Sequence, residues 1–365
     1  MSSLPHDPMQ AVEVADATAV RAEDAFDVDR LCTWLGEHGL AVPGRPEVRQ
    51  FSGGASNLTY LVRLPDRDLI LRRPPGGHKS AGAHDMSREY RIQHALRPVF
   101  GYVPTMVGLC EDVEVIGTPF YVMERVDGHI PRQDFPPEME LSTDEIAGLC
   151  TRSLDVLIDL HQLDPAAAEL GWLSRGQGYI HRQLGGWSKR YRQAMTPDVG
   201  DFESVMAWLD ENEPVDDRSC LIHNDFRFDN LVFDREHPHD PVGLLDWELA
   251  TIGHPLMDLG GALAYWIEAD DEPDLHEFRR QPTQVAGMLS RRQVVDHYCT
   301  RTNIGLSERE WAFYEIFGLF RTAAICQQIY YRYYHGQTTN PAFQAFGRLT
   351  VLMERRSLEL IGRHR

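Results

Sequence analysis

The sequence predicts an α+β protein with two lobes, a small antiparallel-sheet N-lobe and a larger, mainly helical C-lobe. Its 365 residues exceed what one small hydrophobic core usually organises. Up to about residue 124, short apolar runs alternate with polar residues and are separated by turn formers, as expected of half-buried strands. Beyond that point apolar residues mostly recur at helical spacing. We therefore expect the N-lobe over residues 26–124 and the C-lobe over residues 125–365.

The N-terminal segment differs from the rest of the chain. Residues 1–25 are acidic, rich in alanine and without periodicity, which predicts a flexible tail. After Asp27, apolar residues at helical spacing predict a helix that ends at Gly39. Glycine is a common residue just beyond a helix C-terminus.

Composition restricts the classes of partner. The chain has 36 basic and 55 acidic residues and a net charge of -19. This charge repels nucleic acid and anionic membranes, so we expect neither as a partner. An anionic substrate would need a local cluster of arginine and lysine. Six scattered cysteines without a C-x-x-C pair indicate reduced thiols. No signal peptide or membrane span is visible, so we expect a cytoplasmic protein.

Two predicted strands, residues 48–51 and 58–64, flank a turn of small residues. Such a turn lets backbone N–H groups approach phosphate oxygens closely, although a glycine hairpin without a ligand is the commoner structure. The candidate phosphate-binding residues are Ser52, Gly53, Gly54, Ala55, Ser56 and Asn57.

A third strand, residues 68–73, ends in two arginines. In kinase-like lobes, a cation at this place contacts the α- and β-phosphates and pairs with a glutamate of the next helix. Here Arg72 takes that position, with Arg73 as the alternative register, and Glu89 on a predicted helix over residues 87–96 is the partner. A surface strand end beside a solvated helix is the other interpretation.

Residues 113–116 and 119–123 predict the last hairpin of the N-lobe sheet. The following segment, residues 124–128, ends in glycine and suits a hinge. Its backbone at Glu124 and Val126 can form hydrogen bonds with an adenine edge.

The predicted C-lobe contains helices over residues 143–161, 307–334 and 341–362. The segment of residues 178–193 is the most basic part of the chain and includes Trp187 and Tyr191. A solvated helix face is the usual meaning of such a segment, and binding of an anionic substrate is the alternative. Its candidate substrate residues are Arg182, Lys189, Arg190 and Arg192.

The most informative stretch is residues 221–247. His223, Asp225 and Asn230 have the spacing H-x-D-x-x-x-x-N, and Asp246 follows a second short apolar run. This is the catalytic-loop pattern of kinase-like enzymes. Asp225 would accept the proton of an attacking hydroxyl, and Asn230 and Asp246 would hold Mg²⁺. We group His223 and the cation Arg227 with Asp225 as catalytic candidates. Asp and Asn are also common turn formers, so a hairpin without catalytic function is the alternative.

Asp258 lies in the first turn of a predicted helix that begins at His254-Pro255. Its carboxylate could cap that helix or accept N–H groups of the catalytic loop, and the sequence leaves both roles open.

Taken together, these segments resemble the aminoglycoside phosphotransferase and choline kinase family of small-molecule kinases. The motifs HNDFRFDN and LLDWE carry the resemblance, and the phrases LILRRPPGG and GTPFYVMERVDG are similar to the kinase-like domain fused to some acyl-CoA dehydrogenases. Two departures are visible. Arginine replaces lysine at the strand position, and Trp247-Glu248 follows Asp246 where protein kinases have Phe-Gly.

The resemblance implies a two-lobed protein kinase-like fold and the transfer of the γ-phosphate of ATP, with Mg²⁺, to a hydroxyl of a small molecule. A hydroxyacyl-CoA or similar acid is the implied acceptor, and an acyl-CoA dehydrogenase is an expected partner in the same pathway. The alternatives are an aminoglycoside phosphotransferase and a pseudokinase-like nucleotide-binding module. The basic segment of residues 178–193 is unlike the acidic cleft of enzymes that modify polycationic antibiotics.

Overall fold

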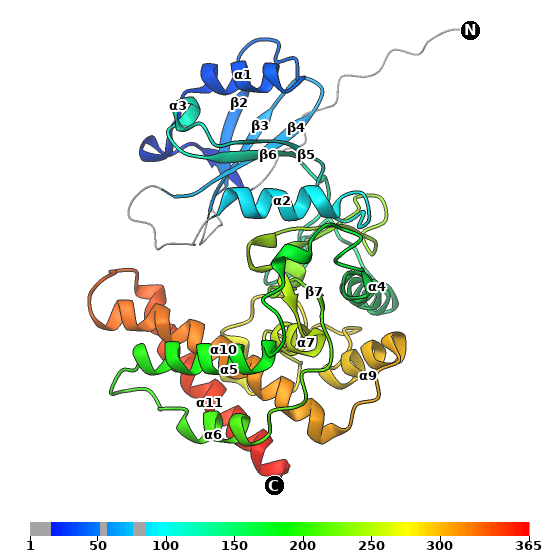
Figure 1. The fold of residues 1–365 in the computed structure, drawn as a ribbon, viewed down its shortest axis with the longest axis vertical. Helices are drawn as coiled ribbons and strands as arrows, with labels where there is room; N and C mark the ends of the chain where they lie inside the picture. The colour runs from blue at the N-terminus through cyan, green and yellow to red at the C-terminus, as the bar shows by residue number, and fades with distance from the viewer. Residues whose placement is uncertain (1–15, 52–56, 76–84, 365) are drawn as a thin grey trace. The chain divides into compact units, whose positions relative to one another are not determined.

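The chain forms two compact units, Met1–Asp127 and Gly128–Arg365, each of which is described by itself. The computed structural model describes residues 16–51, 57–75 and 85–364. The first unit is built on an antiparallel sheet and the second is mainly helical, which confirms the predicted α+β class (Figure 1). The division lies just after the boundary that the sequence predicts at residue 124.

The described part of the first unit contains a six-stranded sheet with the order β1-β2-β3-β4-β6-β5. All neighbouring strands are antiparallel. The strands are β1 (Ala17–Ala19), β2 (Glu47–Phe51), β3 (Leu58–Arg63), β4 (Asp68–Arg73), β5 (Met106–Cys110) and β6 (Phe120–Glu124). The helical segments are a 3-10 turn (Ala22–Asp24), α1 (Val28–Glu37), α2 (Met86–Leu96) and α3 (Val113–Ile116).

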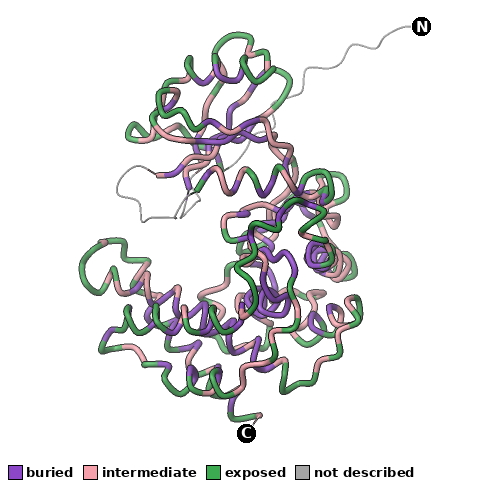
Figure 2. The backbone as a smooth tube through the Cα atoms, in the orientation of Figure 1, coloured by how far each residue is buried: buried purple, intermediate pink, exposed green. Residues whose placement is uncertain are grey.

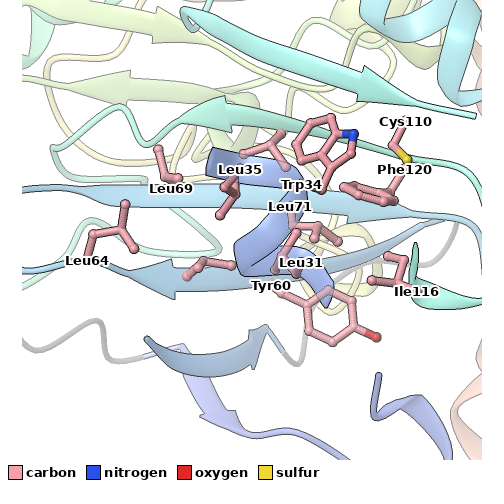
Figure 3. Close-up of a cluster of buried hydrophobic side chains, with 12 residues drawn as sticks. Leu31, Trp34, Leu35, Tyr60, Leu64, Leu69, Leu71, Cys110, Ile116 and Phe120 are labelled. Atoms are coloured by element: carbon pink, nitrogen blue, oxygen red, sulfur yellow. The ribbon is translucent and has the colours of Figure 1, made fainter. Parts of the chain in front are cut away.

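Helices α1 and α2 cover opposite faces of this sheet (Figure 1). Because side chains alternate along a strand, Leu69 and Leu71 of β4 point to one face and pack in a cluster with Trp34 of α1 (Figure 3). Ile70 points to the other face, where it packs in a cluster with Met86 at the start of α2. Because both faces are covered, β4 carries the unbroken apolar run Leu69-Ile70-Leu71 and shows no alternation of apolar and polar residues.

Two predictions for the first unit are wrong. The flexible tail was expected to reach residue 25, but Ala17–Ala19 pairs with β2 and Ala17 is buried. Residues 113–116 form the short helix α3 instead of a strand. Asp112 caps its N-terminus by accepting the Glu114 N–H, and Gly117 ends it in the left-handed region. The partner of β6 is β5, which the sequence did not predict.

The second unit is composed mainly of helices. They are α4 (Thr143–Gln162), α5 (Tyr179–Gln193), α6 (Glu203–Glu211), α7 (Pro255–Leu263), α8 (Pro273–His276), α9 (Arg291–Thr302), α10 (Glu308–Tyr334) and α11 (Ala345–Arg363). Four 3-10 turns connect them: Gly171–Leu173, Phe228–Asn230, Trp247–Leu249 and Pro341–Gln344. In the part of the chain that the structure describes, no helix is both long and apolar enough to cross a membrane.

Two small antiparallel hairpins hold the motif residues. Strand β7 (Cys220–Ile222) pairs with β10 (Thr251–Gly253), and β8 (Leu231–Phe233) pairs with β9 (Pro241–Leu244). All residues of β7 and β8 are buried, as is every residue of α7, which follows β10 (Figure 2). The loops that carry the motif residues His223, Asp225, Asn230 and Asp246 therefore start and end in a packed core, which fixes their backbones.

Helices α7 and α10 make a very close contact through glycines. A Cβ added to Gly318 of α10 would lie 2.1 Å from the carbonyl oxygen of Gly260, and one added to Gly260 would lie 2.3 Å from the Tyr314 carbonyl. These neighbours are backbone atoms and cannot rotate away. The two helices therefore need glycine at both positions.

We expect Gly318→Ala to lower the free energy of unfolding by about 2 kcal/mol, because overpacking of a close contact outweighs the gain in helix propensity. Urea unfolding followed by circular dichroism measures this change. The matched control is Gly362→Ala in α11, where an added Cβ meets nothing within 4 Å; it should raise stability by up to about 1 kcal/mol. Equal effects of the two variants would contradict the proposed helix contact.

Candidate active site

In the first unit, a buried ion pair joins the sheet to α2. Arg72 Nη1 lies 2.5 Å from Glu89 Oε1, which also accepts the Tyr121 hydroxyl at 2.7 Å. The second carboxylate oxygen of Glu89 accepts the Asn57 amide at 3.5 Å. Glu89 is 1% exposed, so three donors hold a carboxylate that water hardly reaches. The pairing of strand arginine and helix glutamate is as predicted.

The structure also decides between the two registers. Arg72 follows Ile70 by two positions and so lies on the face covered by α2. Arg73 lies on the other face, where its guanidinium donates to the Tyr60 hydroxyl at 2.8 Å and 3.0 Å. Arg73 therefore belongs to the packing around α1, and Arg72 takes the predicted position.

Other predicted residues of this unit are only partly described. Ser52, Gly53, Gly54, Ala55 and Ser56 lie outside the described residues, and Asn57 is buried beside Glu89.

The predicted hinge follows the end of β6. The Glu124 N–H donates to the Thr105 carbonyl at 2.8 Å, so that N–H is already used within the sheet. Val126 lies two residues further on in an irregular, half-buried segment. Between them, Arg125 forms ion pairs with Asp68 at 3.1 Å and Asp127 at 2.7 Å, which tether this segment to β4.

In the second unit, His223 packs against the loop of residues 224–230, which we call the motif loop. Its side chain is fully buried and its ring packs edge-on against Trp247. Nε2 is 3.0 Å from the Leu245 carbonyl and Nδ1 is 3.3 Å from the Asp225 N–H. The ring therefore donates through Nε2 and accepts at Nδ1, tying the Asp225 backbone to the segment before Asp246. We assign His223 a positioning role in place of the predicted catalytic one.

Asp225, Asn230 and Arg227 meet at one carboxylate. Asp225 Oδ2 accepts the Asn230 amide at 3.2 Å and the Arg227 guanidinium at 3.2 Å. The same amide nitrogen also donates to the Asp225 carbonyl at 2.8 Å. This anchoring turns Oδ1 of Asn230, the oxygen able to bind a metal, away from Asp225. The spacing of five residues is short enough for a single loop to form this contact.

Asp246 follows β9 and has a left-handed backbone, with φ of 68°. Such a conformation is unusual outside glycine and is often found at functional sites. The next residue, Trp247, is buried and its indole N–H donates to the Leu244 carbonyl at 2.9 Å. The residue after the aspartate is thus locked in the core, which fixes the backbone of Asp246.

A buried carboxylate supports the loop from below. Asp258 in α7 accepts the N–H of His223 at 2.7 Å and that of Asn224 at 2.8 Å. It also contacts His161 Nε2 at 3.1 Å, and Nδ1 of this ring is 2.6 Å from the Tyr298 hydroxyl. Burial alone would raise the pKa of Asp258, but the bonds from His161 and His223 hold it below its usual value. The sequence leaves open whether Asp258 caps its helix or accepts N–H groups of the catalytic loop. The structure shows the second role, which we call the loop brace.

Arg227 contacts two carboxylates and one aromatic ring through its guanidinium. It lies 3.2 Å from Asp229 as well as from Asp225, and its guanidinium stacks 5.0 Å from the Tyr265 ring centre. Burial lowers the pKa of Arg227, but the two carboxylates outweigh burial and the net shift is upward. Burial raises the pKa of Asp229. The Arg227 side chain is therefore a fixed cation beside Asp225.

The basic segment of residues 178–193 forms α5, but its cations have different surroundings. Arg192 makes two contacts of 2.7 Å with Glu203, so its charge is already matched. Arg182 donates to the carbonyls of Gln177 and Gly176 at the start of the helix. Lys189 is exposed. Arg190 stacks on Trp187 at 4.5 Å. The four side chains do not converge on one site.

Two residues that the sequence analysis missed also hold the motif loop. Gln281, which is 1% exposed, accepts the Phe228 N–H at 3.0 Å through its side chain. Arg321 of α10 donates to the Asn224 carbonyl at 2.8 Å. Arg321 follows the apolar run GLF and precedes TAAI. A lone charge within an apolar helix was the signal that could have revealed it.

Comparison with known proteins gives three consistent findings. The family model described as "Phosphotransferase enzyme family" matches residues 47–293. Acyl-CoA dehydrogenase family member 10 of Mus musculus is 38% identical over 345 residues, which cover 93% of this chain and 32% of that protein. Acyl-CoA dehydrogenase family member 11 of Homo sapiens is 31% identical over 353 residues, with coverages of 95% and 44%. The chain spans less than half the length of these curated relatives.

Among solved structures, a proposed aminoglycoside phosphotransferase from Ralstonia eutropha has a TM-score of 0.78 and 29% identity. The match covers 93% of this chain and 99% of that protein. This likeness confirms the predicted protein kinase-like fold.

The contacts of Asp258 with the motif loop predict how the free energy of unfolding depends on pH. Asp258→Asn replaces one acceptor oxygen with an amide facing a backbone N–H, so the free energy of unfolding at pH 7 should fall by about 3 kcal/mol. Because the pKa of Asp258 is depressed on folding, its ionised form contributes stability above about pH 4, and this contribution is lost as pH falls further. The difference between wild type and variant should therefore narrow in acid.

Urea unfolding at a series of pH values tests this, with Asp210→Asn on the exposed surface of α6 as the control. The control should stay within about 0.5 kcal/mol of wild type. An Asp258→Asn protein as stable as wild type at pH 7 would show that the brace is dispensable.

Proposed function

Because this chain belongs to the phosphotransferase enzyme family, we propose that it is an ATP- and Mg²⁺-dependent kinase that phosphorylates a hydroxyl group of a small molecule. The observation that carries the proposal is the contact among Asp225, Arg227 and Asn230, on a loop braced by Asp258. The Asp225 carboxylate is the candidate proton acceptor, and the same carboxylate accepts a hydrogen bond from Asn230, the candidate metal ligand. A packing hairpin has no need for such a half-buried set of charges.

Asp225 is the proposed acceptor of the hydroxyl proton. Its backbone is fixed by the His223 ring and its carboxylate by Asn230 and Arg227, so little reorganisation is needed when a hydroxyl arrives. Phosphoryl transfer depends mainly on positioning and on electrostatic stabilisation. Arg227, the fixed cation beside Asp225, is placed to offset negative charge that develops near this carboxylate. No covalent enzyme intermediate is required.

Asn230 and Asp246 are the proposed Mg²⁺ ligands, and their donor set fits the ion. The Asn230 amide nitrogen is bonded to Asp225, which leaves its oxygen for a metal, and a carboxylate with an amide oxygen is a hard ligand set. Within the described residues, no group of three or more His, Cys, Asp or Glu could hold a metal by itself. This suits an ion that is also held by phosphates. Bound Mg²⁺ would neutralise charge on the nucleotide phosphates.

In the first unit, the proposed nucleotide contacts are Arg72, held by Glu89, and the backbone around Glu124 and Val126. The small-residue turn, Ser52 to Asn57, is the proposed phosphate loop. Arg72 has a fork-shaped guanidinium and its orientation is fixed by the buried Glu89. The pairing supports a role for arginine where related enzymes have lysine.

The proposed acceptor is a hydroxyacyl-CoA or a related hydroxy acid, with an acyl-CoA dehydrogenase acting in the same pathway. Two relatives carry acyl-CoA dehydrogenase in their names, and the chain matches only a part of each. The basic residues Lys189 and Arg190 on α5 favour an anionic acceptor over a polycationic antibiotic.

Replacement of the proposed base should separate binding from chemistry. We expect Asp225→Asn to lower phosphoryl transfer on the order of 10²–10⁴-fold, the usual contribution of a general base, while ATP affinity stays within about threefold. ATP consumption is measured over a panel of hydroxyacyl-CoAs, amino alcohols and aminoglycosides, and affinity is measured by calorimetry. Asp240→Asn, which changes contacts of a partly exposed carboxylate with Arg152 and His239, is the control. A variant that keeps half of wild-type turnover would refute the assignment.

Metal binding should depend on the nucleotide. With one amide and one carboxylate, we expect weak Mg²⁺ binding to the free protein and much tighter binding when ATP is present. Asp246→Ala should abolish the tight phase and leave the fold intact, as judged by circular dichroism. Calorimetry that finds tight Mg²⁺ binding without nucleotide, unchanged in Asp246→Ala, would rule out the proposed ligand pair.

A further inference from the structure

Arg321 is a buried cation close to the candidate catalytic loop. It is 8% exposed, and no other lysine or arginine among residues 16–51, 57–75 and 85–364 is buried. Within those residues, no carboxylate lies at ion-pairing distance from its guanidinium. Buried charges in proteins are normally paired, because removing an ion from water is costly. A buried and unmatched guanidinium in a chain of net charge -19 therefore needs an explanation.

The contacts that Arg321 does make are neutral. One terminal nitrogen donates to the Asn224 carbonyl at 2.8 Å, and the guanidinium carbon is 5.6 Å from the ring centre of Trp187. Next to it, Gly261 has no side chain, and a Cβ there would lie 3.2 Å from the other terminal nitrogen. A carbonyl and an aromatic face orient the guanidinium but leave its charge unmatched.

The position of Arg321 connects it with the proposed chemistry. Asn224, which it contacts, directly precedes Asp225. The Tyr265 ring stacks against Arg227, and its pKa is raised first by burial and then by Asp225, while Arg227 and Arg321 act in the opposite direction. Asp225, Arg227 and Arg321 therefore lie within electrostatic range of one phenol. An anion bound at Arg321 would lie in the neighbourhood of the proposed proton acceptor.

A second cation extends this surface. Arg190 stacks on Trp187 at 4.5 Å, so one indole ring contacts the guanidinium groups of both Arg190 and Arg321. Arg190 comes from α5 and Arg321 from α10, two helices that pack together in the second unit. Unlike Arg192, which is matched by Glu203, neither has a carboxylate partner among the described residues.

We propose that Arg321 binds an anionic group, a carboxylate or a phosphate, of the hydroxyl-bearing acceptor, with Trp187 and Arg190 beside it. The inference rests on the proposed function for the identity of the ligand as an acceptor. Guanidinium groups bind both anions through paired hydrogen bonds. The acceptor is then selected by its negative charge as well as by its hydroxyl.

The test uses three ligands that differ in charge: a short-chain hydroxy acid, its methyl ester and its coenzyme A thioester. Binding of each to the full chain is measured by calorimetry without nucleotide, so that the result does not depend on turnover. The variants are Arg321→Gln, Arg321→Lys and, as the matched control, Arg332→Gln, an exposed arginine of the same helix. Thermal unfolding shows that each variant is folded.

We expect Arg321→Gln to weaken binding of the anionic acceptor by roughly 10–100-fold, which is the usual loss for a charge-assisted hydrogen bond. Arg321→Lys should restore part of the loss because it keeps the charge, and Arg332→Gln should change nothing. A loss confined to the free acid identifies the bound group as a carboxylate. A loss confined to the thioester identifies it as a phosphate of coenzyme A. In both cases the methyl ester should be unaffected.

Three results would overturn the inference: equal weakening of all three ligands, no weakening of any, or no binding of the acid and thioester to wild type. Each would leave Arg321 as a brace for the Asn224 carbonyl only. Turnover with ATP separates this from the proposed function. Binding that depends on Arg321 without phosphate transfer would refute the kinase and keep the anion site. Equal phosphate transfer by wild type and Arg321→Gln would refute the anion site and keep the proposed kinase function.

Discussion

The second unit depends on one buried carboxylate that accepts two consecutive backbone N–H groups. Asp258 holds the N–H groups of His223 and Asn224, and two adjacent amides can point to the same acceptor only if the chain turns sharply between them. Asn224 accordingly has φ of 66°, a conformation that non-glycine residues adopt at a cost. This turn sets the direction in which Asp225 leaves the strand, so the position of the candidate base follows from a residue in α7.

Much of the candidate site could be predicted because its key contact is local. Asp225 and Asn230 are five residues apart, and a loop of that length can bring carboxylate and amide together without help from distant segments. The choice between Arg72 and Arg73 could not be made from local pattern. Both end the same strand, and only the packing of α2 against the Ile70 face decides which one meets Glu89. Strand alternation predicts two faces but does not say which helix covers each.

Where prediction failed, a stronger local signal or a distant contact was responsible. Residues 113–116 contain β-branched valines and isoleucine, yet Asp112 and Gly117 cap them as a helix, and capping outweighs strand propensity in so short a segment. The sequence shows that residues 178–193 are basic, but it does not show the partners of these side chains. Glu203, the partner of Arg192, lies outside the segment. The partners of Arg182 are backbone carbonyls, which every residue has. Gln281 and Arg321 reach the loop from distant segments that spacing cannot reveal.

If Arg321 binds the acceptor as proposed, the glycine contact between α7 and α10 has a consequence for substrate selectivity. Gly318 precedes Arg321 by three residues, so both lie on the same side of α10, and Gly261 adjoins Gly260 on the facing helix. The separation of the two helix axes therefore sets how deeply the guanidinium reaches toward Asn224. Related sequences with larger residues at this crossing would carry the cation further from the loop and accommodate a longer spacer between hydroxyl and charge. Divergence of acceptor length could thus arise from substitutions in the core, without substitution of any residue that the acceptor contacts.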